Sequence, residues 1–600
     1  MSGHPGVPPD AAPPSSSRAA PRRARGIVVL KFGSSVLRED HGLWPAVHEI
    51  YREVRRGRRV VAVVSATGRT TDELLARARA VAPAPAPECL GPLLASGERA
   101  AAALLGLALD AAGVPAVVLD PADIGLRLTG DRLDAEPSSL DVAALRAALR
   151  RRAVAVLPGF FGVHEGGGTA LLGRGGSDLT ALFVAQQLGA RCRLLKDVDG
   201  IYDADPARED SRRYRALRFE DAARLGARVV QAKALALARF HALKFTVAAP
   251  GAGPEGGTRV GSAITEAVPR RAPPPPLRVV LLGFGTVAAA VYRQLGALPD
   301  SFHVVRVAVR NPARHAGHGV PPELLTSAAE QAALEPADVV VELLGGLEPA
   351  TRIIRGALEA GRHVVTANKA VIADCGPPLA RLARDRDVRL LYSASVAGAV
   401  PAIEHLRRVA RRGRIERMDG ILNGTSNFVL DRVAGGATLG AALAEARRLG
   451  FAEADATLDL DGTDAAQKLE ILARAAFGTS PGWQAIPRSG VTDSTERRAR
   501  DAAAAGRVVR LVASAWRAVR GVHATVQLRE LRPSHPLAAV HNEENGLVIR
   551  TTSAGRRERT LLRGRGAGPQ PTAVAVLADL LDLRRERAGR ERDEVMEVTR

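Results

Sequence analysis

Short, continuously apolar runs recur along the chain, separated by longer stretches dominated by alanine, leucine and arginine. The first four runs are "GIVVLKFG" (26–33), "RRVVAVVSA" (58–66), "VPAVVLD" (114–120) and "RRAVAVLPGF" (151–160). Their length and their β-branched residues are typical of parallel strands that are buried on both faces. Helical stretches such as 178–189 lie between runs, and the alternation resumes after residue 276. The pattern predicts an α/β fold in both halves of the chain.

Breaks in composition divide the chain. Residues 1–25 are rich in proline, serine, alanine and arginine, and we expect a disordered tail there. Residues 266–276 contain four consecutive prolines, which favour a stiff spacer. The last stretch, 584–600, is highly charged, and we expect a second tail. The 600 residues of the chain are too many for one hydrophobic core, so the sequence between the tails predicts roughly three to four domains.

Composition narrows the classes of function. The net charge of +20 is typical of nucleic-acid binding proteins. The arginines, however, are spread along the whole chain and aromatic residues make up 3%, so we rank a basic regulatory protein last and expect no nucleic-acid partner. We expect no membrane partner either, because no window holds about twenty uninterrupted apolar residues and the N-terminus lacks an apolar signal core. The three cysteines follow no metal or redox spacing, which predicts a cytoplasmic location.

Lysine is rare in this chain, and its positions are informative. Six of the 84 basic residues are lysines, and the rest are arginines. A lysine among so many arginines can mark a place that needs a compact ammonium rather than a planar guanidinium, although chance retention is the alternative for any one of them. Five of the six lie inside the motifs described below: Lys31, Lys196, Lys233, Lys369 and Lys468.

The first half contains strand-to-loop junctions suited to phosphate chemistry. "VVLKFGSSVL" (28–37) is a strand that leads through Lys31 into a turn with Gly33, where backbone N–H groups can approach phosphate and the ammonium can offset the charge of phosphoryl transfer. "LGRGGSDLTALFVAQQLG" (172–189) is a glycine-rich loop opening a helix, whose N-terminus favours anions. "LLKDVDGIYDADP" (194–206) ends a strand in carboxylates suited to Mg²⁺ and a nucleotide.

Seven motifs in order make residues 26–265 resemble the aspartate kinases of the amino-acid kinase family. They are KFGSS, SATGRTTDEL, SGER, PGFFG, GRGGSD, DVDGIYDADP and GARVVQAKA. The resemblance implies an α/β domain that uses ATP and Mg²⁺ to phosphorylate L-aspartate, with Lys31 and Lys233 stabilising the transferring phosphoryl group. The other implied site residues are Gly33, Ser34, Ser35, Lys196, Asp197 and Tyr202 for the nucleotide, and Thr71, Glu98, Arg174, Ser177 and Asp178 for aspartate.

This half departs from the family pattern in several places. The phosphate turn is one residue shorter, Lys196 stands where the family has threonine, and Gln231-Ala232 replaces the usual histidine-proline before Lys233. The usual DPR is "DPAR" here. The departures leave open an alternative in which the second half is an active enzyme and the first half is a degenerate, kinase-like binding or scaffold module.

The second half opens with a dinucleotide-binding fingerprint. "LRVVLLGFGTVAAAVYRQL" (277–295) reads as a strand, a tight turn and a helix with the spacing G-x-G-x-x-A, which predicts cofactor contacts along the 283–288 turn. The contacting residues are Gly283, Phe284, Gly285, Thr286 and Val287. The next strand (302–315) ends without an acidic residue and offers Arg310 and Arg314 instead, which favours NADP over NAD, although surface arginines are the alternative.

Further motifs make residues 277–580 resemble homoserine dehydrogenases. They are "VVELLGGLEPA", "VVTANKAVIA", "SVAGAVPAIEHL", "GILNGTSNFVL" and "GRGAGPQPTAVAVLADLL", together with the acidic stretch "AEADATLDLDGTDAAQK" (452–468). The resemblance implies a Rossmann domain over 277–395 and an α+β substrate and dimerisation domain over 396–583. It also implies a homo-oligomer, at least a dimer, that interconverts L-homoserine and L-aspartate 4-semialdehyde.

The acidic stretch fits the chemistry of that substrate. Homoserine carries an ammonium that needs carboxylate partners, and its hydroxyl must exchange a proton as hydride moves. If a helix begins at residue 463, Asp464 and Lys468 are i,i+4 neighbours, for which an ordinary surface ion pair is the alternative. By the resemblance, Lys468 transfers the proton and Asp464 orients it. Other implied contacts are Lys369 and Gly566 for the cofactor, Gly424, Thr425, Glu453 and Asp459 for the substrate, and the carbonyls of Val396, Gly398 and Val400 for a structural sodium ion.

Taken together, the motifs predict a bifunctional aspartate kinase–homoserine dehydrogenase. Bifunctional relatives usually carry small regulatory modules of the ACT type between the two activities. Here the kinase motifs end near residue 264 and the dinucleotide strand starts at Leu277, whereas a folded module needs about 50 residues. We therefore expect a chain without such modules.

Overall fold

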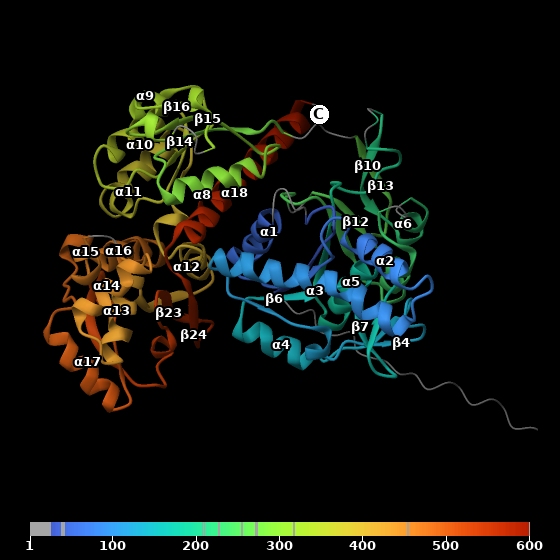
Figure 1. Cartoon of the computed structure of the whole chain (residues 1–600). Helices are drawn as coiled ribbons and strands as arrows, with labels where there is room; N and C mark the ends of the chain where they lie inside the picture. The colour runs from blue at the N-terminus through green and yellow to red at the C-terminus, as the bar shows by residue number, and fades with distance from the viewer. Residues whose placement is uncertain are drawn as a thin grey trace, which may run out of the picture.

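The computed structural model describes most of the chain (Figure 1). The described residues are 26–37, 43–206, 208, 210–225, 229–253, 256–269, 274–315, 319–452 and 455–598, with side chains described as far as Arg587. The expected tail over 1–25 and the predicted substrate contact Glu453 lie outside these residues.

The kinase-like half is built on a nine-stranded sheet, in which β9, β1, β2, β6 and β3 run parallel. Its central strands are the apolar runs of the sequence, and five of the six residues of β1 are fully buried. The strand order is β13(Glu266–Pro269), β10(Arg212–Leu217), β12(Thr258–Val260), β11(Phe245–Ala248), β9(Arg191–Leu195), β1(Ile27–Phe32), β2(Arg59–Val64), β6(Val154–Pro158) and β3(Ala116–Val118). Strand β13 pairs with β10, so the kinase-like sheet extends into the residues for which a spacer was expected.

Helices cover both faces of this sheet, and a small sheet flanks it. The helices are α1(Trp44–Arg55), α2(Thr70–Val81), α3(Pro87–Ala111), α4(Val142–Arg151), α5(Gly176–Leu188), α6(Phe219–Leu225) and α7(Ala232–Phe240). The second sheet has the order β5(Glu136–Ser139), β4(Arg127–Thr129), β7(Phe161–His164) and β8(Thr169–Leu171). Within the described residues, α3 is the one helix long and apolar enough to cross a membrane, and here it packs its buried leucines against the sheets.

A second domain follows directly, since β13 ends at Pro269 and β14 begins at Leu277. Its six parallel strands have the order β16(Leu325–Thr326), β15(Phe302–Ala308), β14(Leu277–Leu282), β17(Val339–Glu342), β18(His363–Thr366) and β19(Leu390–Leu391). In chain order this is 3-2-1-4-5-6, the dinucleotide-binding arrangement that the sequence predicts. Its helices are α8(Thr286–Gly296), α9(Ala329–Leu334), α10(Ala350–Glu359) and α11(Lys369–Asp385).

The third domain is an antiparallel sheet with helices packed on one face. The strand order is β22(Val522–Leu531), β21(Val508–Arg517), β20(Arg414–Ile421), β23(Glu544–Ser553) and β24(Arg556–Arg565). The helices are α12(Ala402–Ala410), α13(Gly424–Ala434), α14(Leu439–Arg448), α15(Thr457–Leu460), α16(Thr463–Phe477) and α17(Ser494–Ala504). The inward face of the sheet and these helices share one large apolar core, so the predicted α+β domain is confirmed.

The last helix, α18(Pro569–Val598), joins the three domains (Figure 1). It lies beside α8 of the dinucleotide domain and also contacts α1 of the kinase-like half. Val574 and Ala578 are buried in the same apolar cluster as the β1 and α1 side chains. The charged residues from 584 onward therefore continue a helix instead of starting a tail, because the other domains supply partners: Arg587 pairs with Asp338, and Glu586 pairs with Arg389.

Because Val574 belongs to a core shared by two halves, we expect Val574→Ala to cost about 1–3 kcal/mol of unfolding free energy and to weaken both sides of that core. Hydrogen exchange followed by mass spectrometry should show lower protection in α1 as well as α18. The matched control Val291→Ala removes the same methyl groups from α8, which packs against the dinucleotide sheet. An unchanged exchange rate in α1 of the Val574 variant would contradict the shared core.

Candidate active sites

The kinase-like half holds a buried aspartate between two lysines. Lys31 lies near the carboxyl end of β1, and Lys196 follows the adjacent parallel strand β9. Asp178, in the first turn of α5, is 2% exposed. Its Oδ1 lies 2.9 Å from the Lys31 Nζ, and its Oδ2 lies 2.7 Å from the Lys196 Nζ. Burial alone would raise the pKa of Asp178, but the two ammonium groups outweigh it and hold that pKa below its usual range.

The turn that follows β1 lies beside this group of charges. The Gly33 N–H donates to the Leu195 carbonyl at 3.3 Å, and the Gly33 carbonyl accepts from Val36 and Leu37. A Cβ on Gly33 would lie 3.5 Å from the Lys31 Nζ, so this glycine keeps the turn close to the ammonium. Ser34 is exposed and Ser35 is half-buried in the same turn. The predicted nucleotide turn therefore lies directly beside the lysine pair.

Glu98 of α3 completes the predicted aspartate side of the site. The side chain is 3% exposed, and its Oε2 has no hydrogen-bond partner among the described residues. Burial raises the pKa of Glu98 to about 8, although the Ala66 and Gly159 N–H groups and the Lys31 charge act in the opposite direction. A buried carboxylate without a full set of partners is costly, which is consistent with a binding role for a cationic group.

Other predicted aspartate contacts surround Glu98 and Asp178 from separate elements. Thr71 is half-buried in the first turn of α2, and Ser177 is buried beside Asp178. A Cβ on Gly159 would come within 2.7 Å of the Ser177 Cβ, so the β6 end packs tightly on the start of α5. Arg174 is exposed on the glycine-rich loop, where Gly173 and Gly175 both have φ near +73°.

Lys233 has a different environment from the other lysines of this half. Its Nζ lies 2.9 Å from the Asp134 Oδ1 and also donates to the Asp134 and Ala135 carbonyls. These partners precede β5, and Asp134 lies against Gly173 of the glycine-rich loop. Lys233 therefore anchors the small sheet beside that loop, and its predicted contact with phosphoryl stays a prediction.

In the predicted nucleotide segment after β9, the carboxylate of Asp199 is already bound by neighbouring side chains. The Tyr202 hydroxyl donates to Asp199 at 2.6 Å, and Arg213 pairs with Asp199 at 3.3 Å, whereas Asp197 is exposed. Within the described ranges, no group of three or more His, Cys, Asp or Glu side chains is arranged to hold a metal ion. Among the described residues, Asp197 is thus an accessible carboxylate that is not part of a preformed group of metal ligands.

The fingerprint turn of the second domain has the required backbone. Gly283 has φ +92°, and a Cβ there would lie 2.8 Å from the Leu343 carbonyl oxygen. Gly285 is exposed and has open space where a Cβ would stand, as close approach of a pyrophosphate requires. Phe284 and Val287 are half-buried, and Thr286 is exposed at the start of α8. Arg310 is exposed just beyond β15, at the strand end where the fingerprint predicts the ribose.

A second buried aspartate lies between two lysines where the dinucleotide domain meets the third domain. Asp464 is 3% exposed in the first turn of α16. Its Oδ2 lies 2.8 Å from the Nζ of Lys468 on the same helix, and its Oδ1 lies 3.0 Å from the Nζ of Lys369, the first residue of α11. Burial alone would raise the pKa of Asp464, but the two lysines together lower it strongly. The i,i+4 pair is confirmed, and its burial excludes an ordinary surface ion pair.

The surrounding groups fix this second pair of lysines. The Lys468 Nζ donates to the Leu422 carbonyl at 2.9 Å. Asn423 donates from its Nδ2 to Asp464 at 2.8 Å and to Asp459 at 2.7 Å. Burial and the Asp464 charge raise the pKa of Asp459. Two carboxylates, Asp459 and Asp464, therefore lie close to the lysine that is predicted to carry the proton.

The remaining predicted substrate contacts, Gly424 and Thr425, follow Asn423, which binds both carboxylates. Gly424 begins α13, and a Cβ there would lie 2.7 Å from the Glu543 carbonyl oxygen. The Thr425 hydroxyl donates to the Phe451 carbonyl at 2.7 Å. Both residues follow Asn423 at the same helix start, so the "GILNGTSNFVL" motif brings its polar groups to one place.

The loop predicted to hold sodium packs against Gly566. Gly398 has φ +52°, and a Cβ there would lie 3.0 Å from the Gly566 backbone. The Val400 carbonyl accepts the Ala402 N–H at 2.7 Å, which leaves it one free lone pair. The Val396 and Gly398 carbonyls lie on the same loop. Carbonyl oxygens suit a hard cation, so the donor set is compatible with the predicted ion.

The sequence reasoning did not single out two polar residues of this site. Glu342, at the end of β17, is fully buried, accepts from the Thr366 hydroxyl at 2.6 Å and from the Leu344 N–H at 2.8 Å, and lies 3.4 Å from the Asn368 Nδ2. Because Asn368 caps the helix that begins with Lys369, Glu342 helps to orient that lysine. The sequence signal for Glu342 was present in "VVELLGG", where one acidic residue ends an apolar strand. The second residue that was not singled out is Asn423, which directly precedes Gly424 and Thr425.

Comparisons with known proteins divide the chain in the same way. The amino acid kinase family model matches residues 26–248, the homoserine dehydrogenase NAD-binding domain matches 283–393, and the homoserine dehydrogenase model matches 401–581. Homoserine dehydrogenase from Corynebacterium glutamicum is 37% identical over 334 residues, covering 53% of this chain and 74% of that protein. The Mycobacterium tuberculosis enzyme is 39% identical over 327 residues, covering 52% and 73%.

A homoserine dehydrogenase crystal structure from Thiobacillus denitrificans shares 37% identity, with a TM-score of 0.49 and coverage of 52% of this chain and 74% of that one. The chain belongs to the homoserine dehydrogenase family, with an amino-acid kinase family domain fused ahead of the dehydrogenase.

Proposed function

We propose that the chain is a bifunctional enzyme. Its first half transfers a phosphoryl group from ATP to L-aspartate, giving 4-phospho-L-aspartate. Its second half interconverts L-homoserine and L-aspartate 4-semialdehyde with NADP. The observation that carries the proposal is that each half holds a buried aspartate between two lysines, at the place where the family motifs predict chemistry.

In the kinase half, the residues position charge around the transferring phosphoryl group. Asp178 orients Lys31 and Lys196, and the two ammonium groups offset the negative charge that spreads over the phosphoryl oxygens. Glu98 accepts the α-ammonium of aspartate in its buried position. Mg²⁺ neutralises part of the phosphate charge when it is bound with ATP, and the exposed Asp197 is the carboxylate best placed to hold it.

In the dehydrogenase half, the residues bind the amino acid and move a proton. NADP, when bound, exchanges a hydride with the carbon that carries the substrate hydroxyl. When the aldehyde is reduced, the Lys468 ammonium donates a proton to the substrate oxygen, and when homoserine is oxidised, the neutral Lys468 amine takes the hydroxyl proton. Asp464 and the Leu422 carbonyl keep the Lys468 Nζ in place. Asp459, held by Asn423, receives the substrate ammonium, and a cation there would favour its charged form.

The alternative of a degenerate kinase-like module is less well supported. A binding module has no need of two lysines on one buried carboxylate or of a buried Glu98 with an unpartnered oxygen.

We further propose a cytoplasmic homo-oligomer, at least a dimer, acting on these small molecules. Its support is the family resemblance and the three free cysteines, Cys89, Cys192 and Cys375. The sodium ion at Val396, Gly398 and Val400 also stays a proposal.

Two assays on purified full-length protein test the bifunctional assignment. ATP-dependent formation of aspartyl phosphate is trapped as the hydroxamate, and homoserine-dependent reduction of NADP is followed by absorbance. Lys31→Ala should lower the first rate about 10²–10³-fold and leave the second unchanged. A wild-type protein that forms no hydroxamate but oxidises homoserine would favour the degenerate kinase-like module.

Lys468→Ala should abolish homoserine oxidation, because the variant lacks the group that exchanges the hydroxyl proton, with an expected loss of about 10²–10⁴-fold in kcat. NADP binding, measured by titration calorimetry, should change by less than about threefold, since Lys468 lies on α16 and the fingerprint turn starts α8. A variant that lost NADP binding but kept its turnover at saturation would show that Lys468 is structural.

The kinase should respond to the protonation of Glu98. Its pKa is raised to about 8, so the carboxyl is neutral below that pH and cannot pair with the aspartate ammonium. We therefore expect kcat/KM for aspartate, measured by ADP release, to rise between pH 6.5 and 8.5 by up to about tenfold per unit. In Glu98→Gln this rise should disappear and kcat/KM should stay low. A rise that persists in that variant would assign it to another group.

NADP should be preferred to NAD, because Arg310 is exposed where a 2′-phosphate would lie. Arg310→Ala should raise KM for NADP about five- to tenfold and leave KM for NAD nearly unchanged. The control Arg293→Ala removes an exposed arginine from the last turn of α8, away from that position, and should change neither constant. Equal use of both cofactors by the wild type would refute the arginine argument.

A further inference from the structure

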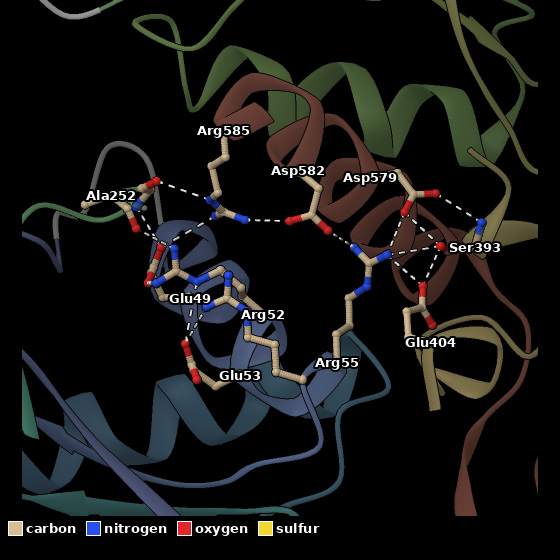
Figure 2. Close-up of polar contacts among 12 residues, drawn as sticks. Glu49, Arg52, Glu53, Arg55, Ala252, Ser393, Glu404, Asp579, Asp582 and Arg585 are labelled. Atoms are coloured by element: carbon tan, nitrogen blue, oxygen red, sulfur yellow. Dashed lines mark hydrogen bonds and ion pairs between the residues drawn. The ribbon is translucent and has the colours of Figure 1, made fainter. Parts of the chain in front are cut away.

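Helix α1 of the kinase half is buried on nearly every side, although it carries many charges. Glu49, Arg52, Glu53 and Arg55 are all less than 9% exposed. A helix on the outside of a sheet normally leaves its polar face in water. Here that face is covered by α18, the last helix of the dehydrogenase half (Figure 2). The charges of α1 therefore have to be satisfied across the junction between the two enzymes.

Arg55 makes the central contacts of this junction. Its Nη2 lies 2.7 Å from the Asp579 Oδ1 and 2.6 Å from the Glu404 Oε1, and its Nη1 lies 3.2 Å from the Asp582 Oδ2 (Figure 2). The same Nη2 donates to the Ser393 hydroxyl at 3.0 Å. One kinase guanidinium thus holds side chains from α18, from α12 and from the segment that follows β19.

Ser393 connects this ion cluster to the backbone of the dehydrogenase site. Its N–H donates to the Asp579 Oδ2 at 3.0 Å, and its hydroxyl donates to Glu404 at 2.5 Å. Three residues later the chain enters the loop 396–400, in which Gly398 lies against Gly566. The cluster therefore fixes the start of a loop whose middle residue, Gly398, touches the predicted cofactor residue Gly566.

The kinase half also supports the far side of that loop. A Cβ on Gly113, after α3, would lie 3.3 Å from the Ala399 Cβ, and Ala399 is buried in the apolar cluster of the kinase sheet. A Cβ on Gly564 would lie 2.9 Å from the Val400 side chain and 3.3 Å from the Gly113 carbonyl. Kinase residues and the ion cluster thus hold the loop from two sides.

We propose that Arg55, a residue of the kinase half, is a positioning residue of the dehydrogenase, which sets the loop 396–400 against Gly566 and so shapes the cofactor site. The proposal rests on the proposed dehydrogenase function. Arg55 lies at the end of α1, so it acts through Ser393 and the loop and not on the reacting atoms. By this inference the dehydrogenase depends on its kinase neighbour for the geometry of NADP binding.

A second set of contacts should keep the halves docked when Arg55 is replaced. Arg585 of α18 donates to the Gly251 carbonyl of the kinase half at 3.3 Å, and its Nη2 lies 3.9 Å from the Oε1 of Glu49 on α1. Glu49 is itself held within the kinase half, because it pairs with Arg52 at 2.6 Å (Figure 2). It also accepts the Gly251 N–H at 2.7 Å. These contacts and the shared apolar core do not include Arg55, so the Arg55 variants are suitable for measurement in the folded full-length chain.

The test compares Arg55→Ala with Arg58→Ala in full-length protein. Arg58 is the matched control, because its Nη1 pairs at 2.5 Å with Glu53 within the kinase half. Arg55→Ala should raise KM for NADP at least about fivefold, with a smaller change in KM for homoserine and in kcat, because the substrate pocket at Asp464 lies outside the cluster. Hydroxamate formation should stay within about twofold of wild type in both variants.

The pH dependence separates positioning from a general loss of structure. Without Arg55, the carboxylates of Glu404 and Asp579 lose the cation between them, whereas Asp582 keeps its pair with Arg585. Protonation relieves the repulsion between Glu404 and Asp579. Burial raises the pKa of Asp579 to about 6 even in the wild type, so acidification reaches this group readily. The charged and titratable groups facing the cluster are Tyr51 and Arg55 of α1, Glu404, His405 and Arg408 of α12, and Asp579, Asp582 and Arg585 of α18.

The increase in KM for NADP caused by Arg55→Ala should therefore become smaller as the pH is lowered from 8 to 6. Adding Asp579→Asn to the Arg55→Ala variant should bring KM for NADP at pH 8 part of the way back to the wild-type value. Arg55→Lys, which keeps the charge but not the planar fork, should give an intermediate KM. If Arg55→Ala fails to fold, KM for NADP in Arg55→Lys decides whether Arg55 has the positioning role.

The proposal would be overturned if KM for NADP in Arg55→Lys, and in any folded Arg55→Ala, equals the wild-type value. It would also be overturned if the increase in KM for NADP does not change with pH. A wild-type protein that reduces no NADP with homoserine would instead overturn the proposed function itself. A wild-type protein with normal dehydrogenase activity and a normal Arg55→Ala variant would remove only the positioning role.

Discussion

A buried carboxylate that holds two ammonium groups is the interaction on which both sites depend. Asp178 holds Lys31 and Lys196, and Asp464 holds Lys369 and Lys468. Burying one carboxylate is costly unless cations and hydrogen bonds compensate it, and each aspartate here has two lysines within 3.0 Å. In each site the two lysines come from separate elements, so neither site exists until its sheet or its domain pair has assembled. The surplus positive charge beside Asp178 suits a transferring phosphoryl group, and the surplus beside Asp464 suits the substrate oxygen that gains negative charge and a proton when the aldehyde is reduced.

The kinase half and the dehydrogenase half are packed against each other. Strand β13 still belongs to the kinase sheet, β14 begins the dehydrogenase, and α18 returns from the end of the chain to lie between α1 and α8. Val574 and Ala578 of α18 share an apolar core with the kinase sheet, and Arg55 places a kinase charge among dehydrogenase carboxylates. Direct docking of this kind takes the place that a separate module would occupy between the halves.

Local sequence patterns predicted the main elements and several of the contacts that the structure shows. The apolar runs predicted the strands, the fingerprint predicted Gly283 and Gly285, and the i,i+4 spacing predicted the contact of Asp464 with Lys468. The scarcity of lysine was informative, since four of the chain's six lysines bind the two buried aspartates. Long-range contacts could not be predicted, because no local pattern encodes them. Neither the pairing of Asp178 with two lysines nor the burial of Arg55 has a signal in its own segment. The anchoring of Lys233 by Asp134 and the continuation of α18 beyond residue 584 likewise depend on partners far along the chain.

The isosteric change Asp464→Asn tests the central role of the buried aspartate most directly. It keeps the shape of the side chain and removes the charge that Lys369 and Lys468 share, so the two ammonium groups would face each other without a counterion. The account predicts that homoserine oxidation falls by about 10²-fold or more, while NADP binding stays within about threefold and hydroxamate formation by the kinase half is unchanged. Homoserine oxidation within about threefold of the wild-type rate would contradict the account, because the aspartate would then be dispensable for placing the proton-transferring lysine.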